Sequence, residues 1–312
     1  MEARLVFAGT PGFAAAHLQV LLERGAVPAA VYTQPDRRAG RGQHLRPSAV
    51  RQLAEAHGLE VRTPRDFSDP HEAERLAALR PQLLVAVAYG VLLPPAVLNI
   101  CPCINVHASL LPELRGAAPI ARALLEGRTQ TGITLMRMAE RLDAGDMLLQ
   151  ETCPIGPDDT SESLAQRLSG IGARLLADHL EDLLCGRLHG VAQDESRASY
   201  ARKLSRHDAP LDFTRTPQEL ERQVRGLIPW PVATFSAGGQ SFKVFRARAR
   251  TERHDLAPGT LAALTPEHLA VACSGGMLEI EIMQPPGRGP MRAGQYAGGR
   301  PDVFSVGMVL SG

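Results

Sequence analysis

An uninterrupted apolar run, Leu83–Ala88, is the feature that most constrains how this chain can fold. A strand without polar–apolar alternation is buried on both faces, which is the position of an inner strand in a parallel sheet. Shorter strand-like runs at 4–8 and 27–32 alternate with helical patterns at 13–24 and 48–57. This alternation predicts an α/β domain with a doubly wound, mostly parallel, Rossmann-like sheet.

The pattern changes after about residue 206, where glycine and proline turns separate short alternating strands. Those strands are expected at 232–235, 240–246, 259–264, 269–273 and 277–283. Many short strands at this spacing indicate a small C-terminal β-barrel of the OB type. The domains expected from the sequence are therefore 1–188, a linker at 189–205, and 206–312.

Composition narrows the class of protein further. The chain has 312 residues, 44% of them apolar, so two domains can each bury a core. A net charge of +1 means that any nucleic-acid contact has to come from a local basic patch. The five cysteines fit no zinc spacing and suggest free thiols in a reducing compartment. No run of about 18 uncharged apolar residues and no signal-peptide pattern is present, so we expect no membrane span and a cytoplasmic protein.

The pair Asn105 and His107 is the first candidate for chemistry. Residues i and i+2 of a strand face the same side, so one carboxamide and one imidazole are presented together. Such donors suit a reaction that develops negative charge on a carbonyl oxygen. Asp143, in the turn after an apolar strand at 132–138, would orient or charge the imidazole or relay a proton. A buried structural histidine and a turn-forming aspartate remain alternatives for these residues.

Four segments in order carry a family resemblance: Ile104–Pro112, Arg115–Ile120, Thr131–Thr134 and Leu142–Gly145. In residue type and spacing they resemble the formyltransferases that use 10-formyltetrahydrofolate. The resemblance implies that Asn105, His107 and Asp143 are catalytic and that no metal is required. It also implies two groups of folate-binding residues, a binding motif and a pterin pocket: Ser109, Leu110, Leu111 and Pro112, and Tyr89, Gly90, Val91 and Leu92.

Two basic features bear on the acceptor of the formyl group. A glycine-containing loop carries four arginines that can pair with phosphates, although a solvated surface loop is the simpler interpretation: Arg37, Arg38, Arg41 and Arg46. A basic stripe is expected along one strand of the β module, with an ordinary solvated face as the alternative: Lys243, Arg246, Arg248 and Arg250.

Further segments resemble those members of the family that formylate methionyl-tRNA: Val6–Pro11, Gln34–Arg37, Tyr200–Leu204, Leu211–Phe213 and Pro229–Val232. This resemblance implies transfer to the α-amino group of methionine on initiator methionyl-tRNA, giving N-formylmethionyl-tRNA for translation initiation. The arginine loop would then probe the acceptor stem, and the β module would hold the tRNA body. We expect a monomer whose partners are this tRNA and a reduced folate.

Three alternatives remain open at this point. The same chemistry can serve another amine, such as glycinamide ribonucleotide or an amino sugar. The stretch Gly9–Gly12 suggests a nicotinamide dehydrogenase, but it lacks the G-x-G-x-x-G pattern. The third alternative is a noncatalytic RNA-binding protein, which formyl transfer unaffected by His107→Ala would favour.

Overall fold

The structure is a computed structural model that describes residues 4–39 and 44–312. The chain divides into two compact units. The first contains the residues up to Pro119 together with Gln130–Pro154 and Ala165–Ala201; the second contains Ile120–Thr129, Ile155–Leu164 and Arg202–Gly312. Most of the stretch 189–205 therefore lies within the first unit, and the predicted division into separate domains stays a prediction.

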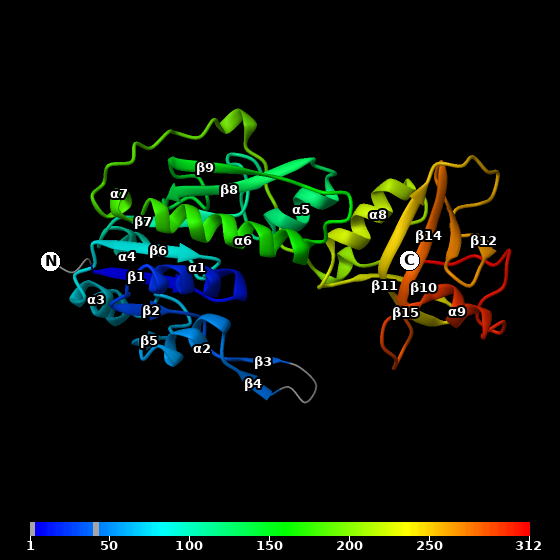
Figure 1. Ribbon diagram of the computed structural model, residues 1–312, viewed down its shortest axis with the longest axis horizontal. Helices are drawn as coiled ribbons and strands as arrows, with labels where there is room; N and C mark the ends of the chain where they lie inside the picture. The colour runs from blue at the N-terminus through cyan, green and yellow to red at the C-terminus, as the bar shows by residue number, and fades with distance from the viewer. Residues whose placement is uncertain (1–3, 40–43) are drawn as a thin grey trace. The chain divides into compact units, whose positions relative to one another are not determined.

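A seven-stranded sheet forms the centre of the first unit (Figure 1). Its strands, in spatial order, are β5 (Val61–Arg62), β2 (Ala30–Tyr32), β1 (Leu5–Gly9), β6 (Leu83–Val87), β7 (Cys103–His107), β8 (Gln130–Arg137) and β9 (Met147–Pro154). The first five strands pair in parallel, and β8 and β9 continue the sheet antiparallel. The predicted doubly wound, mostly parallel sheet is confirmed.

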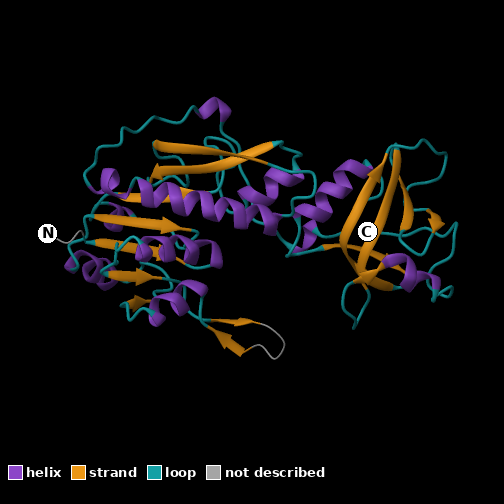
Figure 2. Ribbon diagram, in the orientation of Figure 1, coloured by secondary structure: helices purple, strands orange, loops and turns teal. Residues whose placement is uncertain are grey.

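Every residue of β1 and β6 is buried, as the absence of alternation predicts. One face of these strands packs on apolar residues from flanking helices, including Leu76 and Val97. The helices of the first unit are α1 (Gly12–Glu23), α2 (Ala49–Ala56), α3 (Pro70–Ala78), α4 (Pro95–Leu98), α6 (Ser161–Asp178, from its fifth residue on) and α7 (Leu180–Leu184), with a 3₁₀ turn η1 at Glu195–Arg197 (Figure 2). α6 and α7 are separated by His179.

Local capping explains where several helices begin. Ser48 precedes α2, and its hydroxyl accepts a hydrogen bond from the Arg51 amide at 3.0 Å. Thr216 and Glu219 form a reciprocal capping box at the start of α8 (Pro217–Gly226). These side chains satisfy amide groups that a helix leaves without partners in its first turn.

The arginine-rich segment that the sequence suggests as a flexible loop is partly a hairpin. Strand β3 (Arg37–Ala39) pairs antiparallel with β4 (His44–Arg46), and Arg37 lies opposite Arg46. The hairpin projects from the sheet next to α2 in Figure 1. The tip, with Arg41, lies outside the described residues.

The second unit is built on a curled antiparallel sheet, a half-barrel. Its strands are β10 (Ala233–Ala237), β11 (Gln240–Arg250), β14 (Gly276–Gln284), β13 (Leu269–Cys273) and β12 (Leu261–Leu264) in spatial order, with β15 (Met291–Arg292) beside β14. Residues near the C-terminus bridge both ends of this order, Ser311 to Ser236 and Val309 to Thr260. The unit also contains α5 (Pro119–Leu125, from its second residue on), η2 (Arg206–Asp208), α8 and α9 (Ala293–Gly298). The predicted C-terminal β module is confirmed in this form.

Two further observations concern the whole described chain. Among the residues that the structure describes, none of the helices combines the length and the apolar character needed to cross a membrane. All five cysteines are unpaired thiols, with Cys185 exposed and the others buried.

A buried histidine supports α1. The side chain of His17 is fully buried, and its Nδ1 donates to the Phe13 carbonyl at 2.8 Å. Its Nε2 is buried and has no hydrogen-bond partner within the described part of the chain. Burial lowers the pKa of His17 from 6.5 to about 4, against the raising effect of the Phe13 hydrogen bond.

This shift predicts an acid-dependent loss of stability. Between pH 6.5 and about 4, the unfolded chain binds a proton at His17 that the folded chain does not bind. The free energy of unfolding should therefore fall by about 3 kcal/mol as the pH falls through this window, and this contribution should not fall further below pH 4. Urea unfolding of the wild type and of His17→Gln from pH 7 to pH 4 measures the difference. Parallel curves for the two proteins would rule the effect out.

Candidate active site

Asn105 and His107 lie at the end of β7, the last parallel strand of the sheet. Asn105 lies opposite Ala86 of β6, and His107 lies opposite Thr134 of β8. The two side chains are two residues apart on one strand and share one side, as predicted. Ligands of open α/β sheets bind at the carboxyl ends of the parallel strands, and this pair stands at that edge.

The surroundings of His107 determine which ring nitrogen carries a proton. Nε2 lies 3.0 Å from the Leu114 carbonyl oxygen, which can only accept, so Nε2 is the protonated donor. Nδ1 faces the carboxylate of Asp143, with 3.7 Å between Nδ1 and Oδ2. That separation is longer than a hydrogen bond, and the side chain of His107 is only 6% exposed. The nitrogen that faces the carboxylate and can exchange a proton is therefore Nδ1.

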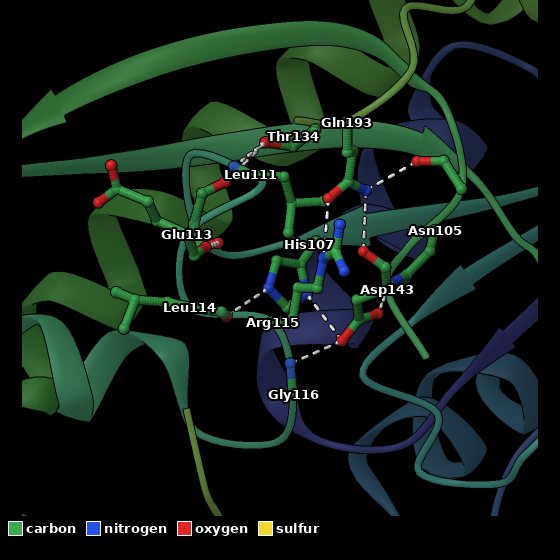
Figure 3. A network of polar contacts seen from close by, with 12 residues as sticks. Asn105, His107, Leu111, Glu113, Leu114, Arg115, Gly116, Thr134, Asp143 and Gln193 are labelled. Atoms are coloured by element: carbon green, nitrogen blue, oxygen red, sulfur yellow. Dashed lines mark hydrogen bonds and ion pairs between the residues drawn. The ribbon is translucent and has the colours of Figure 1, made fainter. Parts of the chain in front are cut away.

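Asp143 comes from the turn between β8 and β9 and meets both residues of β7 (Figure 3). Its Oδ1 accepts from Asn105 Nδ2 at 3.2 Å, and its Oδ2 accepts from the Gly116 amide at 2.8 Å. The carboxylate thus has a different donor on each oxygen as well as an imidazole beside it. The structure brings the three predicted catalytic residues together.

The backbone of this turn is constrained. Asp143 has φ = 51°, in the left-handed region, which costs a residue with a Cβ about 1 kcal/mol. Gly145 lies so close to the Arg137 carbonyl that a Cβ there would collide with it. Gly116 has φ = 109°, and a Cβ there would lie 2.9 Å from the Ala201 carbonyl oxygen. The two glycines allow the turn and the 114–116 segment to approach their neighbours closely.

The predicted folate-binding motif Ser109–Pro112 forms the loop directly after β7. Ser109 is buried, and its hydroxyl donates to the Glu113 carbonyl at 2.6 Å. Thr134 and Gln150 hold the backbone of this loop through three hydrogen bonds: Thr134 Oγ1 to Ser109 O at 2.7 Å, Leu111 N to Thr134 Oγ1 at 3.2 Å, and Gln150 Nε2 to Leu111 O at 2.9 Å. In this structure the motif shapes the loop that leads to Leu114, the acceptor of His107; its contact with folate stays a prediction.

The predicted pterin-pocket residues follow β6, the parallel neighbour of β7. Tyr89 is buried, and its carbonyl accepts from Thr10 Oγ1 at 2.9 Å and Gln34 Nε2 at 2.8 Å. Burial raises the pKa of the Tyr89 hydroxyl, so it stays protonated. Leu92 is 68% exposed and leaves an apolar surface at this edge.

Three polar residues that sequence reasoning missed lie directly behind the Asp143 turn. Gln193 Nε2 contacts the Asp143 carbonyl, Gln193 Oε1 contacts Arg115, and Arg115 contacts Glu195. Arg115 lies inside one of the family segments, and that was the available signal. Gln193 and Glu195 lie in a polar stretch that is typical of a linker, so nothing local marked them.

The predicted tRNA-binding residues differ in their surroundings. Arg37, Arg38 and Arg46 are exposed on the β3–β4 hairpin, and Lys243 is exposed on β11. The other members of the stripe face carboxylates: Arg246 pairs with Glu281, Arg248 with Asp158 and Glu221, and Arg250 with Glu279. These pairs offset most of the positive charge that the stripe would present. Within the described ranges, no group of three or more His, Cys, Asp or Glu side chains is placed to hold a metal ion.

Comparisons with known proteins agree with this architecture. The "Formyl transferase" family model matches residues 3–180, and the "Formyl transferase, C-terminal domain" model matches residues 203–301. The chain is 48% identical over 295 residues to the methionyl-tRNA formyltransferase of Methylococcus capsulatus, covering 94% of this chain and 96% of that protein. It is 47% identical over 309 residues to the methionyl-tRNA formyltransferase of Pseudomonas paraeruginosa, covering 98% and 99%.

A solved structure shares the fold at low sequence identity. The N-formyltransferase from Helicobacter canadensis superposes with a TM-score of 0.67 at 18% identity, covering 89% of this chain and 99% of that one. The two family models together account for most of the chain, and the relatives match it almost from end to end. The chain belongs to the formyl transferase family.

Proposed function

We propose that this protein transfers the formyl group of 10-formyltetrahydrofolate to the α-amino group of methionine on initiator methionyl-tRNA. The main support for this acceptor is the similarity to two methionyl-tRNA formyltransferases, at 48% and 47% identity over 94% and 98% of this chain. The reaction chemistry is supported by Asn105, His107 and Asp143 meeting at the carboxyl edge of the sheet. The product, N-formylmethionyl-tRNA, serves translation initiation, so the proposed location is the cytoplasm.

The trio provides the groups that formyl transfer needs. Attack of the neutral α-amino nitrogen forms a C–N bond to the formyl carbon and places negative charge on the formyl oxygen. Asn105 Nδ2 uses one hydrogen for Asp143 and has a second to donate to that oxygen. When the bond from the formyl carbon to N10 breaks, one proton has to move from the α-amino nitrogen to N10. His107 Nδ1, beside the Asp143 carboxylate, is placed to carry it.

Reduced folate is the co-substrate that supplies the formyl group on N10. The edge after β6 suits a flat heterocycle, because exposed Leu92 and half-buried Val91 offer apolar contact beside main-chain groups. We assign Tyr89–Leu92 to the pterin pocket and Ser109–Pro112 to the shaping of the folate site. All three members of the trio lie in the first unit. We also propose that the protein acts as a monomer.

An assay with both substrates tests the function. The purified chain, 10-formyltetrahydrofolate and methionine-charged initiator tRNA should yield N-formylmethionine after deacylation of the tRNA. Glycinamide ribonucleotide and an amino-sugar nucleotide serve as competing acceptors. Formylation of either one in place of the tRNA would overturn the proposed acceptor, and no formylation of any amine would overturn the reaction.

The exposed hairpin predicts a contact with tRNA phosphate. Arg37→Ala should raise KM for the tRNA and leave KM for the folate unchanged, because a surface guanidinium pairs with the nucleic-acid backbone. The slope of log affinity against log salt should fall by about one phosphate contact. Arg24→Ala is the control, since Arg24 is an exposed arginine of the same unit that pairs with Asp178 at 2.9 Å. Equal salt slopes for both variants would exclude a phosphate contact at Arg37.

A further inference from the structure

A chain of hydrogen bonds runs from the protein surface to the backbone of the Asp143 turn. It begins at Arg141 and Glu195, passes through Arg115, and ends with Gln193. Figure 3 shows its inner end, where Gln193 lies between Arg115 and the Asp143 turn. None of these side chains belongs to the trio, and all lie in the first unit.

Gln193 is held in a single orientation. Its Nε2 donates to two carbonyl oxygens, that of Asp143 at 2.8 Å and that of Gly145 at 2.7 Å. Its Oε1 accepts from Arg115 Nε at 2.9 Å. Carbonyls only accept and a guanidinium only donates, so an amide flipped by 180° would lose all three bonds. One side chain thus holds the turn on both sides of Ala144.

Arg115 connects this amide to the His107 side of the site. The residue is completely buried and directly follows Leu114, whose carbonyl accepts from His107 Nε2. Its own amide donates to Ser199 O at 2.8 Å, and its carbonyl accepts from the Ala201 amide at 2.7 Å. Arg115 therefore contacts both sides of the site: it follows Leu114, which binds His107, and it binds Gln193, which holds the backbone of Asp143.

Glu195 keeps the guanidinium in place. Its two oxygens accept from Arg115 at 2.9 and 3.2 Å, and one of them also accepts from Arg141 at 2.9 Å. The hydrogen bonds from Arg115 and then Arg141 lower the pKa of the Glu195 carboxyl to about 2. The carboxylate stays ionised at every pH at which the enzyme would work.

We propose that Gln193, clamped by Arg115, is a positioning residue that sets the distance between His107 Nδ1 and Asp143 Oδ2. Asp143 has to hold a left-handed backbone, and such a conformation persists only where neighbours impose it. The two bonds from Gln193 impose it on the backbone, and the Gly116 amide aligns the carboxylate. This inference rests on the proposed formyl transfer.

Two variants separate the donors of Gln193 from its support of Arg115. Gln193→Met keeps the length of the side chain and removes all three hydrogen bonds. Gln193→Glu keeps the shape and the acceptor for Arg115, but places an oxygen against the two carbonyls. Both variants should lower kcat by about 10- to 100-fold, with KM for folate and for tRNA within about twofold, because misplacing a catalytic group weakens the chemical step.

Two further measurements distinguish positioning from general stability. In the Asp143→Asn background, Gln193→Met should lower kcat by less than about threefold, since a residue that acts through Asp143 has nothing left to position. The exchange rate of the Gly116 amide hydrogen should rise in both single variants, because its acceptor on Asp143 moves. The exchange rate is measured without substrates, so it does not depend on catalytic activity.

The second unit provides a matched control. Gln223 Nε2 also donates to two backbone carbonyls, those of Asp208 and Pro210, both at 2.9 Å. Gln223→Met should lower thermal stability about as much as Gln193→Met does. It should leave kcat and the exchange rate of the Gly116 amide hydrogen unchanged.

The outcomes are distinct from those of the functional assay. No formylation by the wild type would overturn the proposed function. If the wild type formylates the tRNA, three results would each overturn the positioning role. They are a wild-type kcat in Gln193→Met, a wild-type kcat in Gln193→Glu, and a loss of kcat from Gln193→Met that is equal in the wild-type and Asp143→Asn backgrounds.

Discussion

His107→Ala is expected to lower kcat for formyl transfer by roughly 10²- to 10⁴-fold, the contribution typical of a positioned acid or base. Nε2 is bonded to the Leu114 carbonyl, and Nδ1 faces Asp143, so alanine removes the group proposed to move the proton. KM for both substrates should change little, because the loss falls on the chemical step. Single-turnover formylation of methionyl-tRNA measures the rate.

His254→Ala is the matched control for this loss. His254 Nε2 also donates to a backbone carbonyl, that of Gly276 at 2.8 Å, but lies in the second unit. It should keep kcat near the wild-type value. A single-turnover rate for His107→Ala within tenfold of the wild type would remove His107 from the chemistry.

Asp143→Asn should cause a comparable loss of kcat, again roughly 10²- to 10⁴-fold. One oxygen of the Asp143 carboxylate accepts a hydrogen bond from Asn105 Nδ2, and the other accepts one from the Gly116 amide. A carboxamide has only one acceptor oxygen, so its NH₂ group would face one of these donors whichever way it is turned. The variant also removes the negative charge that lies 3.7 Å from His107 Nδ1.

Asp146→Asn is the matched control for Asp143→Asn, because Asp146 lies three residues further along the same turn. Asp146 is 45% exposed, and its carboxylate lies 4.0 Å from Arg137. An exposed pair of this kind contributes little, so kcat should be retained. Equal rates for the two variants would show that the charge of Asp143 has no part in the reaction.

Much of the first unit could be predicted from the sequence because the signals are local. The run at Leu83–Ala88 indicates a strand covered on both faces, and β6 is buried throughout. The spacing of Asn105 and His107 places them on one side of a strand through the geometry of any β-strand. The helices at 13–24 and 48–57 follow from the periodicity of their apolar residues.

Charge was the least predictable property. Arg246, Arg248 and Arg250 look like a basic stripe in the sequence, yet the register of β11 on β14 places Glu279 opposite Arg248. The neighbouring carboxylates of Glu281, Asp158 and Glu221 complete the pairing. Whether the positive charge of a basic residue is neutralised depends on carboxylates from distant segments. These partners cannot be identified from the local sequence.

The sequence by itself determined the sheet and the shared side of Asn105 and His107, and its family segments predicted Asp143 as their partner. These features depend on backbone geometry and on the order of residues along the chain. Only the tertiary structure decided that Nδ1 of His107 faces the carboxylate and that Gln193, 50 residues beyond Asp143, holds its backbone. Hydrogen bonds between distant segments depend on how the chain packs in three dimensions, and such polar contacts leave no periodic signal in the sequence.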